Sequence, residues 1–209
     1  MIKISDDKSI SVSYNVSHIF NVDSMQMKAL REWIIALIYK GATSTKRTRT
    51  LLTPLVGLIF FCIVLFLIIV SFYLDRFFEI KRFVSKPLSL VISAPFLIIG
   101  SFLWLWSAGK FFKTKGTPVP VNPPPQLVTD GPYAYSRNPM MTGLFMVMAG
   151  AGIFFGSITL TFIITPLFVF MSILEFRYIE EPELTKRFGK EYVEYKEKTP
   201  LIIPKLHRN

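Results

Sequence analysis

The chain has 209 residues, of which 51% are apolar and only 18% are charged. Soluble globular domains carry about 25% charged residues, so the composition excludes a disordered chain and favours an integral membrane protein. The single cysteine, Cys62, excludes an internal disulfide. The net charge of +10 suits contact with anionic lipid headgroups. The basic residues form no continuous stripe with interleaved aromatics, which argues against nucleic acid as a partner.

The first fifty residues, 1–50, are predicted to form an N-terminal cytosolic segment. A short strand is indicated by apolar residues that alternate with polar ones, namely Ile10, Val12, Tyr14 and Val16. Residues 25–39 are typical of an amphipathic helix, with Trp33 and two basic residues suited to a membrane surface.

Residues 51–109 are predicted to hold two transmembrane helices. The uncharged run 51–73 is long enough, at about 1.5 Å per residue, for a hydrocarbon core of roughly 30 Å. The second run, 88–109, contains Pro95, which a membrane helix tolerates better than a soluble one.

A helical hairpin is predicted over residues 140–174, within a catalytic region that extends over 110–209. Its arms, 140–155 and 158–174, are separated by a turn at Gly156. The first arm allows close approach of a neighbouring helix through its small residues Gly143, Gly150 and Gly152. We therefore expect an all-α membrane protein with about four transmembrane helices, a C-terminal hairpin and a final cytosolic helix.

The distribution of basic residues predicts the orientation. With four spans, all but four of the 24 Lys and Arg residues fall on one side if both termini are cytosolic. This orientation places both long polar stretches, 110–139 and 175–209, in the cytosol, where a site for a soluble cofactor would need to lie.

The first polar stretch is rich in proline and leads to a turn at Gly131, where the backbone can approach a ligand. Pro139 is predicted to be the first residue of a helix, with Asn138 as its cap. The free amides at such a helix start attract anions. An ordinary loop and helix cap at the headgroup level is the alternative.

The second polar stretch contains two adjacent carboxylates, Glu180 and Glu181, just beyond the apolar hairpin. They fit either the start of a solvated helix or a seat for an ammonium group. Residues 183–198 predict one helix with an apolar, mostly aromatic stripe formed by Leu184, Phe188, Tyr192 and Tyr195. This stripe either serves packing or attracts a cation through its aromatic faces.

These two stretches resemble the isoprenylcysteine carboxyl methyltransferase and phospholipid methyltransferase family. The resemblance covers roughly residues 88 to 204. It rests on several elements that follow one another in a fixed order. These are the proline-rich segment before Gly131, Gly131-Pro132-Tyr133-Ala134-Tyr135-Ser136-Arg137-Asn138-Pro139, Glu180-Glu181, Phe188-Gly189, Tyr192, Tyr195 and Pro204.

The resemblance implies a membrane methyltransferase that binds S-adenosylmethionine at the cytosolic face, while a lipid or isoprenoid-type acceptor enters from the bilayer. The residues it implies for catalysis are Arg137, Asn138 and Glu181. Those it implies for the cofactor are Gln126, Leu127, Val128, Gly131, Tyr133, Asn138, Pro139, Met140, Met141, Glu180, Glu181, Tyr192 and Tyr195. No metal site is expected.

The sequence departs from the isoprenylcysteine branch at Asn138, where that branch usually has histidine. This departure leaves the acceptor open among a carboxylate, a thiol and an amine. Two other functions remain alternatives: a sterol-type membrane reductase that uses NADPH, and a non-enzymatic scaffold of the same fold. The glutamate pair favours a sulfonium cofactor over a pyrophosphate, which would need cations at that place.

Overall fold

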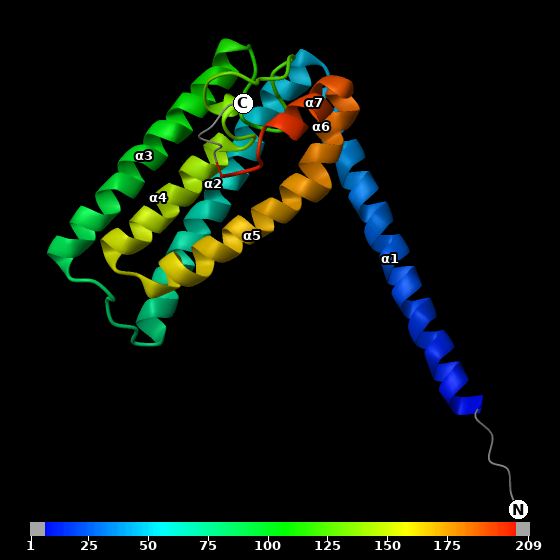
Figure 1. Ribbon diagram of the computed structural model, residues 1–209, viewed down its shortest axis with the longest axis horizontal. Helices are drawn as coiled ribbons and strands as arrows, with labels where there is room; N and C mark the ends of the chain where they lie inside the picture. The colour runs from blue at the N-terminus through cyan, green and yellow to red at the C-terminus, as the bar shows by residue number, and fades with distance from the viewer. Residues whose placement is uncertain (1–6, 204–209) are drawn as a thin grey trace, which may run out of the picture.

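The computed structural model describes the backbone of residues 7–203 and the side chains of residues 25–203. Every regular element in this part of the chain is helical, which confirms the all-α prediction. The helices form a bundle from which the N-terminal helix diverges (Figure 1).

Helix α1 (Asp7–Ala42) runs through the segment in which alternating residues predicted a strand. The strand prediction for Ile10, Val12, Tyr14 and Val16 was wrong. Seven residues make only about two helical turns, so the alternation is too short to outweigh the helical pattern that follows it. The helix expected at 25–39 forms part of α1, and Tyr39 near its end places its ring 4.5 Å from the Lys186 ammonium.

Helices α2 (Lys46–Phe77) and α3 (Lys86–Lys113) contain the first two predicted spans. Both are long and apolar enough to cross a membrane, as is the continuous helical stretch Thr159–Phe188. Helix α4 (Pro139–Phe155) has only 17 residues, or about 25 Å, and is shorter than the hydrocarbon core. Three described helices therefore have full spanning length, and α4 is a shorter apolar helix beside them.

Helices α3 and α4 pack almost backbone to backbone. A methyl group added at Gly143 would lie 2.6 Å from the carbonyl oxygen of Gly100, and one added at Gly100 would lie 2.8 Å from the carbonyl oxygen of Gly143. Neither position can hold a side chain without separating the helices. This agrees with the close approach expected from the glycines of the hairpin.

The predicted hairpin is confirmed. Helix α4 ends at Gly156, whose φ of 67° is left-handed, and the chain returns through the π-helical segment η2 (Thr159–Ile164) and helix α5 (Thr165–Glu175). Between the arms, Met148 and Leu160 are buried against Val64 of α2. The hairpin is thus packed on both neighbouring helices.

The last long helix continues beyond α5 through the π-helical segment η3 (Phe176–Glu180) into α6 (Glu181–Phe188). Glu180 and Glu181 have helical dihedral angles, so the interpretation of this pair as a helix start was wrong. The single helix predicted over 183–198 was also wrong. Gly189, with φ 59° and ψ −130°, separates α6 from α7 (Lys190–Lys198), because that conformation is open to glycine and strained for other residues.

Candidate functional site

The polar end of the bundle is the end where the α3–α4 loop, α6 and α7 meet (Figure 1). The loop is fixed at both sides of its proline-rich part. The amide of Thr117 donates to the carbonyl of Asn122 over 2.8 Å, and Lys110 at the end of α3 forms an ion pair with Asp130. The next residue, Gly131, has a left-handed φ of 61° and begins the short 3-10 helix η1 (Gly131–Ala134).

Tyr133 of η1 joins three elements. Its side chain is buried, and its ring centroid lies 5.1 Å from that of Phe111 in α3. Its carbonyl oxygen accepts a hydrogen bond of 2.7 Å from the hydroxyl of Tyr195 in α7. Burial raises the pKa of both tyrosines, and the negative charge of Glu180 raises them further. Both hydroxyls therefore stay neutral at physiological pH.

The residues that precede α4 pair with the chain that follows α7. The amide of Arg137 donates to the carbonyl of Pro200 over 2.9 Å, and the amide of Asn138 donates to the carbonyl of Leu201 over 3.1 Å. The Ser136 hydroxyl also donates to the Leu201 carbonyl, over 3.2 Å. This pairing brings the C-terminal segment directly beneath the start of α4.

Helix α4 begins at Pro139, as predicted. Asn138 occupies the cap position and its carbonyl accepts the amide of Thr142 over 3.0 Å. Its side chain makes no capping hydrogen bond, contrary to the capping prediction, and its dihedral angles of −124° and 54° differ from the extended ones usual for a capping residue. The side-chain carboxamide of Asn138 is therefore left available for other partners.

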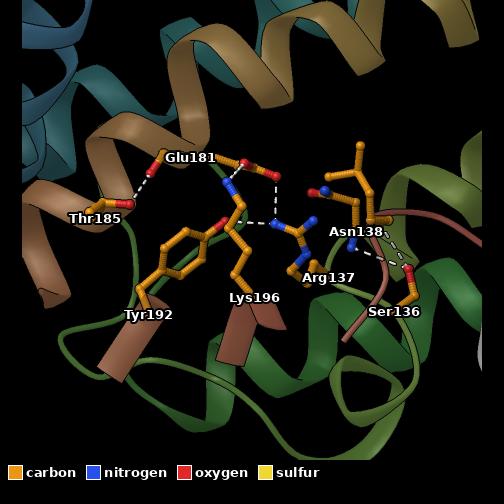
Figure 2. A network of polar contacts seen from close by, with 8 residues as sticks. Ser136, Arg137, Asn138, Glu181, Thr185, Tyr192 and Lys196 are labelled. Atoms are coloured by element: carbon orange, nitrogen blue, oxygen red, sulfur yellow. Dashed lines mark hydrogen bonds and ion pairs between the residues drawn. The ribbon is translucent and has the colours of Figure 1, made fainter. Parts of the chain in front are cut away.

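An ionic network links the two predicted polar stretches (Figure 2). The Arg137 guanidinium lies 2.5 Å from Glu181 Oε1, and the same nitrogen donates to the Tyr192 hydroxyl over 3.3 Å. The other carboxylate oxygen of Glu181 pairs with Lys196 of α7. The glutamate of α6, the arginine before α4 and two residues of α7 thus form one cluster.

The charged side chains of this network are paired, and two of them are buried. The side chains of Arg137 and Glu181 are 10% and 7% exposed, whereas that of Lys196 is 46% exposed. A carboxylate removed from water to this extent requires a close cation, and Glu181 has two. Burial raises the pKa of Tyr192 to about 12 although the hydrogen bond from Arg137 lowers it. The tyrosine therefore acts as a neutral hydrogen-bonding group.

Glu180 differs from its neighbour in having no partner among residues 25–203. Its carboxylate forms no hydrogen bond or ion pair with any residue between 25 and 203. Its charge acts on Tyr133 and Tyr195, whose pKa values it helps to raise. The two adjacent glutamates are thus separated in role: Glu181 holds Arg137, and Glu180 keeps its hydrogen-bonding capacity.

Unused donors lie beside the network. The Nε of Arg137 is buried and has no hydrogen-bond partner in the part of the chain that the structure describes. The amides of Met140 and Met141, in the first turn of α4, donate to no carbonyl or side chain within the described residues. Such amides favour an anion at the helix start. The start of α4 therefore offers donors, while Glu180 offers an acceptor.

The other residues predicted for the cofactor are less closely joined to this network. Gln126 is exposed, Leu127 is partly buried and Val128 is buried in the segment that precedes η1. These three make no polar contact with Arg137 or Glu181 in the described chain. Pro204 lies outside the residues that the structure describes.

Sequence reasoning missed the contributions of Ser136, Lys196 and the carbonyls of Pro200 and Leu201. Lys196 lies 15 residues from its partner Glu181, and Leu201 lies 65 residues from Ser136. Short-range pairing rules cover residues three or four apart on one helix. No local pattern could therefore have found these contacts, which depend on the break at Gly189.

The fold and the site define a class: a helical membrane protein whose last long helix carries paired glutamates against an Arg-Xaa-Pro helix start. Residues 88–191, about half of the chain, match the family model described as phospholipid methyltransferase, and the chain belongs to this family. No curated protein matches the chain. The matched residues run from α3 into α7 and include Arg137, Glu180 and Glu181. The chain is accordingly a membrane methyltransferase.

Proposed function

We propose that the protein transfers a methyl group from S-adenosylmethionine to a lipid or isoprenoid-type acceptor at the polar end of the bundle. The observation that carries this proposal is the Arg137–Glu181 network with Glu180 unpartnered beside it. Family membership supports methyl transfer and favours it over the reductase alternative.

The charges at this end fit the amino-acid part of S-adenosylmethionine. We assign the ammonium group to Glu180, because this carboxylate has no partner of its own among residues 25–203. We assign the carboxylate to the free amides of Met140 and Met141, with the Asn138 side chain as a further donor. Arg137 Nε is one more buried donor, without a partner among the described residues.

Glu181 has a different role in this proposal. Its two oxygens are already paired with Arg137 and Lys196, so it positions the arginine and joins α7 to the last long helix. Its own contact with a ligand would require one of these cations to leave. This modifies the sequence-based expectation, in which both glutamates met the ammonium group.

The aromatic residues complete the site. Tyr195 is held by its hydrogen bond to the Tyr133 carbonyl. Its ring centroid lies 6.3 Å from the ring centroid of Tyr192. Aromatic faces attract cations, so these rings suit a positively charged sulfur. When bound, S-adenosylmethionine supplies a methyl group on a leaving sulfur that is already activated. Residues 126–128, of which Leu127 and Val128 are apolar, are assigned to the adenine.

In this scheme the protein positions the two reactants and excludes water, and it does not act through acid–base chemistry. The network holds the start of α4 and the last helix in one arrangement, which fixes the direction of approach for two reactants. A thiolate or carboxylate acceptor needs no base, whereas a protonated amine must first lose a proton. The acceptor is expected to approach from the apolar surface of the bundle, where α4 is too short to span the bilayer.

The experiment is transfer of a labelled methyl group. Membranes that contain the protein are incubated with methyl-tritiated S-adenosylmethionine, and label is counted in the organic extract. Label above that of membranes with Glu180→Gln supports the proposal. If neither protein yields labelled lipid, while NADPH but not S-adenosylmethionine raises the melting temperature, methyl transfer is the wrong function.

A further inference from the structure

A second charged feature adjoins the ionic network and shares Glu181 and Lys196 with it. A surface cavity of about 400 Å³ opens there between α6, α7 and η3. Its lining consists of Arg177, Glu181, Pro182, Thr185, Lys186 and Lys196. Three of these six residues are cationic and one is anionic.

Two of the three cations of this cavity, Arg177 and Lys186, form no ion pair with any described residue. Glu181 is the one acidic residue of the lining, and it is paired with Arg137, which lies outside the lining, as well as with Lys196. Arg177 forms no hydrogen bond or ion pair with the rest of the described chain. Lys186 contacts the Tyr39 ring of α1, a contact that leaves its charge in place. The cavity therefore suits an anion and disfavours a sulfonium or ammonium group.

The surroundings of the cavity are apolar. Phe170, which is 56% exposed, precedes Arg177 by seven residues and so lies on the same face of the helix about two turns away. On α1, which contacts α6, the exposed side chains of Trp33 and Leu37 precede Tyr39. A ligand in this cavity would have its charged group among cations and its apolar part along membrane-facing side chains.

We infer that this cavity binds the phosphate of an anionic phospholipid, whose acyl chains lie along the exposed apolar face of α5. The lipid docks here as a bound component of the bilayer and need not be a methyl acceptor. The inference therefore goes beyond the proposed function and does not depend on it. The apolar flanks select a lipid over soluble phosphate.

The test uses the full chain purified in a neutral detergent. Short-chain phosphatidylglycerol, which has no amine to methylate, is titrated while the melting temperature is followed. Matched titrations use short-chain phosphatidylcholine and inorganic phosphate. Phosphatidylglycerol is expected to raise the melting temperature in a saturable manner, with little effect of the other two. An equal effect of phosphatidylcholine, or an effect of inorganic phosphate at the same concentration, would overturn the inference.

Variants then locate the site. Arg177→Gln removes a cation that has no partner in the described chain and should weaken phosphatidylglycerol binding about fivefold. Arg177→Gln combined with Lys186→Gln should weaken it about thirtyfold, whereas Arg177→Lys should restore most of the affinity. Lys190→Gln, an exposed lysine outside the cavity, is the matched control. Unchanged affinity in Arg177→Gln would rule out this cavity, even if the double variant failed to fold.

Discussion

The two ends of the bundle each hold an acidic side chain that ties separate helices together, and they do so in different ways. At the turn end, Asp75 of α2 accepts hydrogen bonds from the Ser157 hydroxyl and from the amide and hydroxyl of Thr159, the last two over 3.1 and 2.6 Å. At the polar end, Glu181 is paired with the cations of Arg137 and Lys196.

The difference lies in what remains unused. Asp75 is bound by neutral donors at the start of the returning arm, where it acts as a helix cap supplied by another helix. Glu181 also has its partners, but Glu180, the Asn138 side chain and Arg137 Nε form no hydrogen bond with any other described side chain or backbone group. Among residues 25–203, polar groups without a partner lie at the first end, whereas Asp75 has its donors from Ser157 and Thr159. This contrast supports the proposal that the first end binds a ligand and that the second serves stability.

The largest expected effect on stability is that of a substitution at Glu181. Glu181→Gln leaves the Arg137 guanidinium, 10% exposed, without its counter-charge. Loss of one member of a buried ion pair costs about 3 to 5 kcal/mol, so the melting temperature in detergent should fall strongly. The exposed Glu191→Gln in α7 is the control and should melt like the unaltered protein. Equal melting of both variants would show that the ion pair does not hold the polar end.

A smaller effect is expected at the turn end. Asp75→Ala removes the acceptor of three hydrogen bonds and should cost about 1 to 3 kcal/mol of stability. Asp75→Asn keeps one carbonyl acceptor and should cost less. Binding of S-adenosylmethionine by both variants should match that of the unaltered protein below their melting temperatures. A loss of binding in Asp75→Asn would mean that the two ends are coupled.

The smallest expected effect is at Tyr195. Tyr195→Phe removes the hydrogen bond of 2.7 Å to the Tyr133 carbonyl and should cost about 1 kcal/mol. Because this bond joins α7 to η1, affinity for S-adenosylmethionine should fall only a few-fold, well below the effect of a Glu180 variant. A complete loss of binding would assign Tyr195 a direct contact with the ligand.

Hydropathy was sufficient to predict the apolar helices, the hairpin and the turn at Gly156, since burial in a bilayer requires long uncharged runs. The Arg137-Asn138-Pro139 element and the glutamate pair could be chosen from sequence because they stand in a recognisable order. What the sequence did not reveal depends on tertiary contacts. The π-helical segment before Glu181 and the break at Gly189 decide which carboxylate meets Arg137, and neither follows from local propensity.

We propose above all that the polar end binds the methyl donor through Glu180. The most direct measurement is calorimetric titration of S-adenosylmethionine into the unaltered protein, Glu180→Gln and Asp75→Asn under one set of conditions. Glu180→Gln should bind about tenfold more weakly or worse, with its melting temperature unchanged, while Asp75→Asn should bind normally. Normal binding by Glu180→Gln would show that Glu180 does not hold the methyl donor.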